Sequence, residues 1–302
     1  MNDFPLWDQL PWMHSRTLAT TRSTLHVVES QPNRSPDVLL MHGVLRNWRS
    51  FYPLLPLLHQ TQLAVASFDF RGHGESTNRP NQYRVIEYVD DAQSVLETLD
   101  KPVVLVGHSL GAMVAMAAAA RMPDRVRSLI MEDPPFETMG SKFVGTAFHR
   151  YFLGVHECVK QSQSNAAHLF EDFSNIVVGT KQDGSLLRVR DQRDENSRRF
   201  SVDCLKKTDP SVLESIVSGQ WLSGFDWRGM ISQLQCEVHL LQSDSLCGGM
   251  LSDDDVSVLI RGLGQRCHFN KFEGVGHTIH WQAAPTILQL ILAATTSARV
   301  PK

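Results

Sequence analysis

The sequence contains few cysteines and no long apolar run. Its 302 residues include five cysteines, an odd number without the paired spacing of a metal site. They stand at positions 158, 204, 236, 247 and 267. We therefore expect free thiols, a reducing compartment and a cytoplasmic location. No segment has the roughly 18 consecutive apolar residues that a membrane-spanning helix needs, so we expect no membrane insertion.

The chain also lacks an excess of basic charge and the motifs of nucleotide binding. Its net charge is −3, which excludes the basic surface that nucleic acids require, so we expect no nucleic-acid partner. Met1–Pro11 has two aspartates and no basic residue, which does not fit a secretory signal. No Gly-x-Gly-x-x-Gly follows a strand and no phosphate-binding loop occurs. We expect no cofactor and no metal, and the oligomeric state stays open.

Short apolar runs alternate with segments of helical periodicity along most of the chain. This alternation predicts an α/β fold with a mainly parallel, doubly wound sheet. The expected strands are 24–29, 38–41, 63–68, 103–106, 126–131, 238–242 and 267–272. The expected helices are 51–60, 85–100, 112–121 and 283–295.

Core strands are missing from the middle of the chain. A chain of this length exceeds what one hydrophobic core usually fills, so an accessory lobe is expected. The gap begins at Pro134–Pro135 and is rich in helix formers and aromatic residues. We interpret residues 135–222 as a helical cap inserted into a discontinuous core of residues 1–134 and 223–302. Because open α/β sheets bind ligands at the carboxyl ends of their strands, a cap there shapes a pocket.

The most informative segment is the apolar run Val103–Val106 followed by Gly107-His108-Ser109-Leu110-Gly111. A serine at a sharp strand-to-helix turn has a strained backbone that exposes its hydroxyl, and the flanking glycines leave room for the neighbouring chain. The amide of Leu110 begins the next helix without an intrahelical acceptor. The pattern predicts that Ser109 is a nucleophile.

Three further motifs accompany this turn: Leu39–Val44, Phe68–Ser76 and Gly274–His277. Together they make the chain similar to the α/β-hydrolase family, in its branch with a serine nucleophile and an inserted helical cap. The resemblance implies that His277 is the general base and that the main-chain amides of Val44 and Leu110 form the oxyanion hole. Relatives that open epoxides use an aspartate nucleophile instead, a role that Ser109 cannot take over.

The histidine needs a carboxylate on its second ring nitrogen to fix the tautomer. Asp244 follows the strand 238–242 and gives the chain order Ser, Asp, His expected for this fold, so we favour it. The family usually has a glycine before this acid, which is absent here. Glu132 and Asp133 are the alternatives, since both follow the strand 126–131 and some relatives carry the acid there.

These features predict a serine hydrolase that cleaves an ester-type acyl bond of a small, fairly apolar molecule through an acyl-enzyme. We expect Trp48, His108 and Trp221 to line the substrate pocket. The same triad supports hydrolysis of a carbon–carbon bond, a lactone or a thioester. A ligand receptor with negligible turnover and an acyltransferase are alternatives of other classes.

Overall fold

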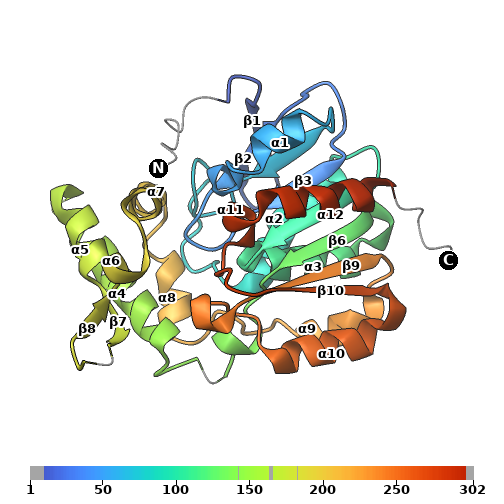
Figure 1. Ribbon diagram of the computed structural model, residues 1–302. Coiled ribbons are helices and arrows are strands. Elements are labelled where there is room, and N and C mark those ends of the chain that lie inside the picture. The colour runs from blue at the N-terminus through green and yellow to red at the C-terminus, as the bar shows by residue number, and fades with distance from the viewer. Residues whose placement is uncertain (1–9, 142, 163–165, 182, 297–302) are drawn as a thin grey trace.

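The computed structural model describes residues 10–141, 143–162, 166–181 and 183–296. Residues 1–9, which include most of the segment examined for a secretory signal, lie outside the described part. A sheet in the order β1-β2-β4-β3-β5-β6-β9-β10 dominates the fold (Figure 1). Its strands are β1 (His14–Ala19), β2 (Thr24–Glu29), β3 (Val38–Met41), β4 (Val65–Phe68), β5 (Val103–His108), β6 (Val126–Glu132), β9 (Glu237–Ser243) and β10 (Cys267–Phe272).

The sheet is parallel from β4 to β10, and β2 pairs antiparallel with both β1 and β4. In the register of the central strands, His108 lies opposite Glu132, and Glu132 lies opposite Leu241. The carboxyl ends of β5, β6 and β9 therefore meet at one edge of the sheet, where open α/β sheets place their ligand sites.

Helices cover both faces of the sheet because side chains alternate between the faces along each strand. Leu39 and Met41 of β3 pack with α2 (Val85–Glu97), α3 (Leu110–Arg121), α9 (Trp227–Met230) and α10 (Asp253–Leu263). Val38 and Leu40 face the other way, toward α1 (Leu55–His59), α11 (Ile279–Gln282) and α12 (Ala284–Thr296). Figure 1 shows α1 and α12 on one side of the sheet and α3 and α10 on the other. This arrangement confirms the predicted fold class.

Residues 147–217 add no described strand to this sheet and lie beside it (Figure 1). They form α4 (Ala147–Ser162), α5 (Leu169–Asn175), α6 (Val189–Gln192), α7 (Glu195–Leu205) and α8 (Val212–Val217). They also contain an antiparallel hairpin of β7 (Val177–Thr180) and β8 (Leu186–Arg188), so the inserted segment is not wholly helical. Short 3-10 helices are η1 (Trp48–Phe51), η2 (Pro123–Arg125), η3 (Glu137–Met139), η4 (Ala166–His168), η5 (Ile231–Gln233), η6 (Ser245–Cys247) and η7 (Gly264–Arg266).

None of the helices in the described ranges combines the length and the apolar character that crossing a bilayer requires.

Candidate active site

Ser109 occupies the turn between β5 and α3 with a strained backbone, φ 54° and ψ −115°. A positive φ is uncommon for a residue with a side chain and occurs often at functional sites. A Cβ on Gly107 would collide with the carbonyl oxygen of Gly111, and a Cβ on Gly111 would collide with that of Met41. Both glycines are therefore required for β5, the turn and the loop after β3 to pack this closely.

Two main-chain amides near Ser109 lack an acceptor. The loop after β3 lies against the turn, since a Cβ on Gly43 would be 3.3 Å from Cβ of Ser109. The next residue, Val44, and the first residue of α3, Leu110, carry N–H groups for which no described residue accepts a hydrogen bond. Two free donors thus flank the serine, the arrangement that an oxyanion hole requires.

His277 forms a short hydrogen bond with Asp133, with Nδ1 2.6 Å from Oδ2. Asp133 follows β6, has φ 48° and is completely buried. Burial raises the pKa of this carboxyl, but its bond and charge interaction with His277 and hydrogen bonds from Ser243 and Met250 outweigh burial and lower it. Asp133 is therefore an anion that makes Nδ1 of His277 the donor and leaves Nε2 as a base.

Our preference for Asp244 as the partner of His277 is wrong. The Asp244 carboxylate instead accepts hydrogen bonds from the amides of Leu246 and Gly274, each at 2.9 Å. These bonds lower its pKa, with the Gly274 amide the largest cause. Because Gly274 begins the turn that leads to His277, Asp244 connects the loop after β9 to the loop after β10. Its role is to shape the histidine loop.

His108 connects the nucleophile turn to His277. Its Nε2 lies 3.0 Å from the carbonyl oxygen of His277, and the two rings are 4.7 Å apart. The ring is buried, and burial lowers its pKa well below 6.5. Within the described part of the chain, no hydrogen bond joins the Ser109 hydroxyl to His277. Such bonds often tighten only when a substrate binds.

Glu132 and His280 form a second carboxylate–imidazole pair beside the first. Nδ1 of His280 lies 2.7 and 2.8 Å from the two carboxylate oxygens, and its Nε2 is 3.0 Å from the carbonyl oxygen of Ser50. Both ring nitrogens therefore make hydrogen bonds to oxygen atoms, one side to the carboxyl group of Glu132 and the other to a main-chain carbonyl. Both side chains are fully buried. The pair joins β6, η1 and α11, and Glu132 is therefore occupied elsewhere and does not contact His277.

We expect Glu132→Gln to lower the free energy of unfolding by about 3–5 kcal/mol, because it breaks a fully buried carboxyl–imidazole pair. Glu237→Gln is the matched control, since Glu237 pairs with His268 at 2.6 Å on the partly exposed β9–β10 edge. It is expected to cost at most about 1 kcal/mol. Urea unfolding measures both, and equal losses would contradict this role of the buried pair.

The motif 68–76 forms a buried hydrogen-bonded turn that supports the loop carrying Val44. Nε2 of His42 accepts from the Phe70 amide, and Nε2 of His73 accepts from the Leu45 amide, each at 3.1 Å. Accepting at Nε2 requires neutral rings. Burial, the largest cause, lowers the pKa of His42 and brings that of His73 to about 3.

The free energy of unfolding should therefore fall as the pH falls below about 6.5. The unfolded chain binds a proton at His73 near that pH, whereas the folded chain binds it only near 3. In this window the buried ring costs about 1.4 kcal/mol per pH unit, and His42 and His108 act in the same direction. Urea unfolding between pH 8 and 5 tests this. His73→Gln should reduce the slope, and a stability independent of pH over this range would contradict the neutral rings.

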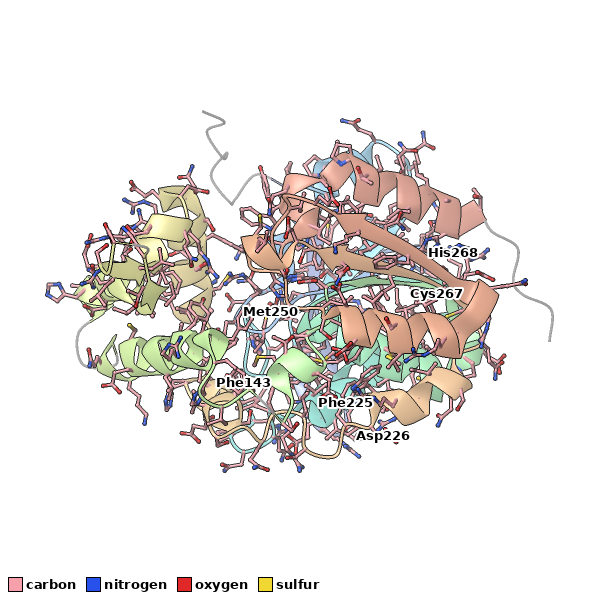
Figure 2. The ribbon with its side chains drawn as sticks, turned by 60° about the horizontal axis from the view of Figure 1, so that its bottom comes forward. Phe143, Phe225, Asp226, Met250, Cys267 and His268 are labelled. Carbon is pink, nitrogen blue, oxygen red and sulfur yellow. The ribbon has the colours of Figure 1, made fainter. Side chains whose placement is uncertain are left out.

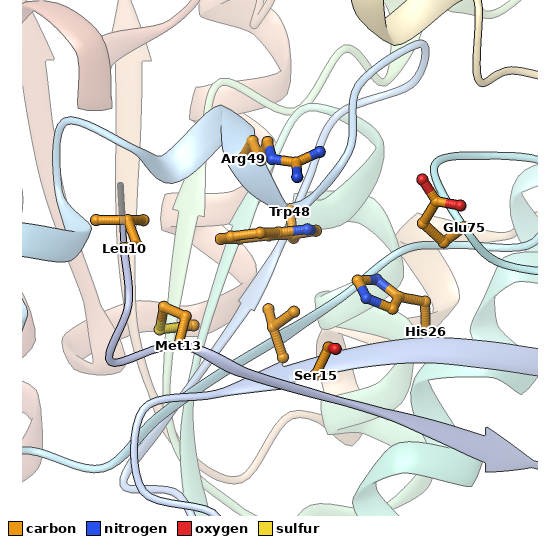
Figure 3. A pocket seen from close by; sticks show the side chains of 8 residues that line it. Leu10, Met13, Ser15, His26, Trp48, Arg49 and Glu75 are labelled. Atoms are coloured by element: carbon orange, nitrogen blue, oxygen red, sulfur yellow. The ribbon is translucent and has the colours of Figure 1, made fainter. Parts of the chain in front are cut away.

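Two of the expected pocket residues lie elsewhere. Trp221 is 1% exposed and packs within the core. Trp48 lines a pocket with Arg49 and Glu75 that also includes side chains near β1 and β2 (Figure 3). None of Ser109, Asp133 and His277 lines this pocket. Two aromatic rings join the core to the inserted segment: Trp281 of α11, four residues after His277, and Phe200 of α7 are 5.3 Å apart.

The site lies at the edge of the core that faces the inserted segment. Met250, whose amide donates to Oδ2 of Asp133 at 2.8 Å, is on this edge, and Phe143 lies just before α4 (Figure 2). The contact between Phe200 and Trp281 could not be predicted from sequence, because it joins segments that are distant in the chain. Among the described residues, no group of three or more His, Cys, Asp or Glu side chains is arranged to hold a metal ion.

Comparisons with known proteins give one family. A family profile described as alpha/beta hydrolase fold matches residues 36–283. The chain is 39% identical over 127 residues to 2-(acetamidomethylene)succinate hydrolase of Mesorhizobium japonicum, covering 41% of this chain and 45% of the relative. It is 36% identical over 123 residues to lipase LipV of Mycobacterium tuberculosis, covering 39% and 44%. The alignments thus span less than half the length of these relatives.

The solved structures show the same architecture. An esterase from Exiguobacterium antarcticum superposes with a TM-score of 0.71 and 14% identity, covering 94% of this chain and 100% of the esterase. At this identity the likeness concerns the fold alone.

Proposed function

The chain belongs to the α/β-hydrolase family, and on that premise we propose that it is a serine hydrolase that cleaves an ester-type acyl bond of a small molecule. One observation carries the proposal: the Asp133–His277 hydrogen bond of 2.6 Å beside the strained turn of Ser109. A buried carboxylate that orients an imidazole near a serine at a strained turn is the arrangement that activates serine.

The proposed reaction has two steps. In the first, Oγ of Ser109 attacks the ester carbonyl while Nε2 of His277 takes the hydroxyl proton, which it then gives to the departing alcohol. In the second, water loses a proton to Nε2, attacks the acyl-enzyme and releases the acid and free Ser109. Asp133 stabilises the imidazolium formed in each step, and the amides of Val44 and Leu110 bind the oxyanion.

The relatives support the coarser part of this proposal, since both are named as hydrolases or lipases. The same groups would also serve for a thioester, a lactone or a carbon–carbon bond, so ester hydrolysis is the narrower claim. A fairly apolar substrate is supported by the ring of Phe200 on the inserted segment, which lies 5.8 Å from the guanidinium of Arg46 in the loop after β3. We also propose a cytoplasmic location, supported by the five free thiols.

Labelling and turnover together test the function. A fluorophosphonate should label Ser109 covalently, and p-nitrophenyl butyrate should be hydrolysed with steady turnover. A panel of the corresponding thioester, lactone and β-diketone identifies the bond type. A single stoichiometric burst would instead support a receptor or an acyltransferase. Native protein that stays unlabelled at Ser109 and inactive on the whole panel would overturn the proposal.

A further inference from the structure

Two arginines, one on the core and one on the inserted segment, each lie over an aromatic ring of the inserted segment. Arg46 lies in the loop after β3, two residues beyond Val44, whose amide is one of the free donors beside Ser109. Arg193 follows α6 on the inserted segment. Chain geometry keeps the α-carbons of Val44 and Arg46 within about 7 Å of each other. The Arg46 side chain therefore starts close to the proposed oxyanion hole.

The Arg46 guanidinium is partly buried against apolar and aromatic groups. It lies 5.8 Å from the centre of the Phe200 ring and donates a hydrogen bond to the carbonyl oxygen of Leu45 at 3.1 Å. No carboxylate among the described residues pairs with it. A guanidinium has five N–H donors in a planar fork, so most of its donors remain available.

Arg193 is in the same situation. Its guanidinium lies 5.2 Å from the centre of the Tyr151 ring and donates to the Tyr151 hydroxyl at 3.3 Å. It too has no carboxylate partner within the described ranges. Its charge reaches Arg46: burial is the largest cause that lowers the pKa of Arg46, and the positive charge of Arg193 lowers it further.

This arrangement contrasts with other arginines of the chain. The buried Arg71 pairs with Asp91 at 2.6 Å, and even the exposed Arg199 pairs with Glu195. Two partly buried guanidiniums that repel each other without a counter-ion are unfavourable for the empty protein. The charge of Arg46 also reaches the ring of His108, next to Ser109, where it contributes to the lowered pKa. An anion between the two arginines would remove the repulsion close to the reacting groups.

We propose that Arg46 and Arg193 bind a carboxylate of the substrate, so that the ester carries one acidic end and a short apolar chain. The inference rests on the proposed function and narrows its substrate class. The guanidinium fork matches the planar, bidentate geometry of a carboxylate. Phe200 and Tyr151 would contact the chain between the carboxylate and the ester. Because the α-carbons of Arg46 and Val44 lie within about 7 Å of each other, one small molecule can carry both the carboxylate and the ester.

Binding tests the subsite without requiring catalysis. Calorimetric titration of the whole protein with adipate and with its neutral diamide should show binding of adipate alone. Arg46→Gln and Arg193→Gln should each raise the adipate Kd about 10- to 100-fold. Arg190→Gln is the matched control, because Arg190 is an exposed arginine of α6, three residues before Arg193, and its replacement should leave the Kd unchanged. Equal binding of acid and diamide, full affinity in both subsite variants, or tighter binding of inorganic phosphate would overturn the proposal.

Turnover then separates the two proposals. The ratio of kcat/KM for mono-p-nitrophenyl adipate to that for its methyl ester should exceed 1 in the native protein and fall about 10-fold or more in either variant. If adipate binds through both arginines but no ester is cleaved and Ser109 resists the phosphonate, the subsite holds and the hydrolase assignment fails. If esters are cleaved with no preference for the acid, the hydrolase assignment holds and the subsite fails.

Discussion

Ser109→Ala is expected to lower kcat for p-nitrophenyl esters by a factor of about 10⁴ to 10⁶. The change removes the hydroxyl that forms the acyl-enzyme, and no other described serine occupies a turn with positive φ. Alanine tolerates φ 54° no better and no worse than serine, so the free energy of unfolding should stay nearly the same. Steady-state kinetics and urea unfolding measure the two quantities on one preparation.

Ser245→Ala is the control for this change. Ser245 is an exposed serine at the start of η6, in the loop after β9. The Ser245→Ala variant should retain the native kcat and the native labelling of Ser109 by the phosphonate, whereas the Ser109→Ala variant should lose both. Residual turnover above about 1% in Ser109→Ala, with labelling retained, would place the nucleophile at another residue and remove the basis of the proposed mechanism.

Sequence periodicity was sufficient to predict the central sheet. The predicted ranges 24–29, 38–41 and 267–272 coincide with β2, β3 and β10, and the other predicted strands differ from the structure by at most two residues at an end. Burial explains this success, because all residues of β3, β4 and β5 are buried and these strands are mostly apolar.

The elements that sequence analysis missed lack that signal. None of the side chains of β1 is buried, and its position is determined by antiparallel pairing with β2, a long-range contact. The strands β7 and β8 are short and contain no buried residue, so they too lack the apolar signal. The helix α10 had a local signal, since the Ser252 side chain accepts from the Asp255 amide ahead of an amphipathic segment, a recognisable N-cap.

In the site, local motifs located Ser109 and His277 but could not rank the carboxylates. Asp133 and Asp244 follow neighbouring strands, β6 and β9, so both reach the same sheet edge. The choice depends on side-chain direction. Asp133 has a positive φ, and its carboxylate receives the amides of Ser243, Met250 and Leu251 in addition to His277. The three amides belong to residues that follow Asp133 by 110 positions or more. The spacing of residues within a motif cannot predict such contacts.

The second large effect is expected from replacing Asp133, the acid that pairs with His277. Asp133→Asn should lower kcat by a factor of about 10⁴, because the amide can donate to Nδ1 of His277 and so stabilise the wrong tautomer. The structural reason is the 2.6 Å contact between Nδ1 and Oδ2, which accepts a hydrogen only from a protonated Nδ1. KM should change little, since Asp133 is completely buried and does not reach a substrate. Steady-state kinetics across the pH range in which the protein stays folded measures this.

Asp244→Asn is the matched comparison, because it makes the same chemical change at the other candidate acid. Asparagine keeps one oxygen acceptor for the Leu246 or Gly274 amide, so the histidine loop should survive and kcat should fall less than about 10-fold. Urea unfolding separates loss of chemistry from loss of the loop that Asp133 supports. A defect confined to Asp244→Asn would mean that the His277 loop rearranges when substrate binds and that the Asp133 contact belongs to the resting protein only.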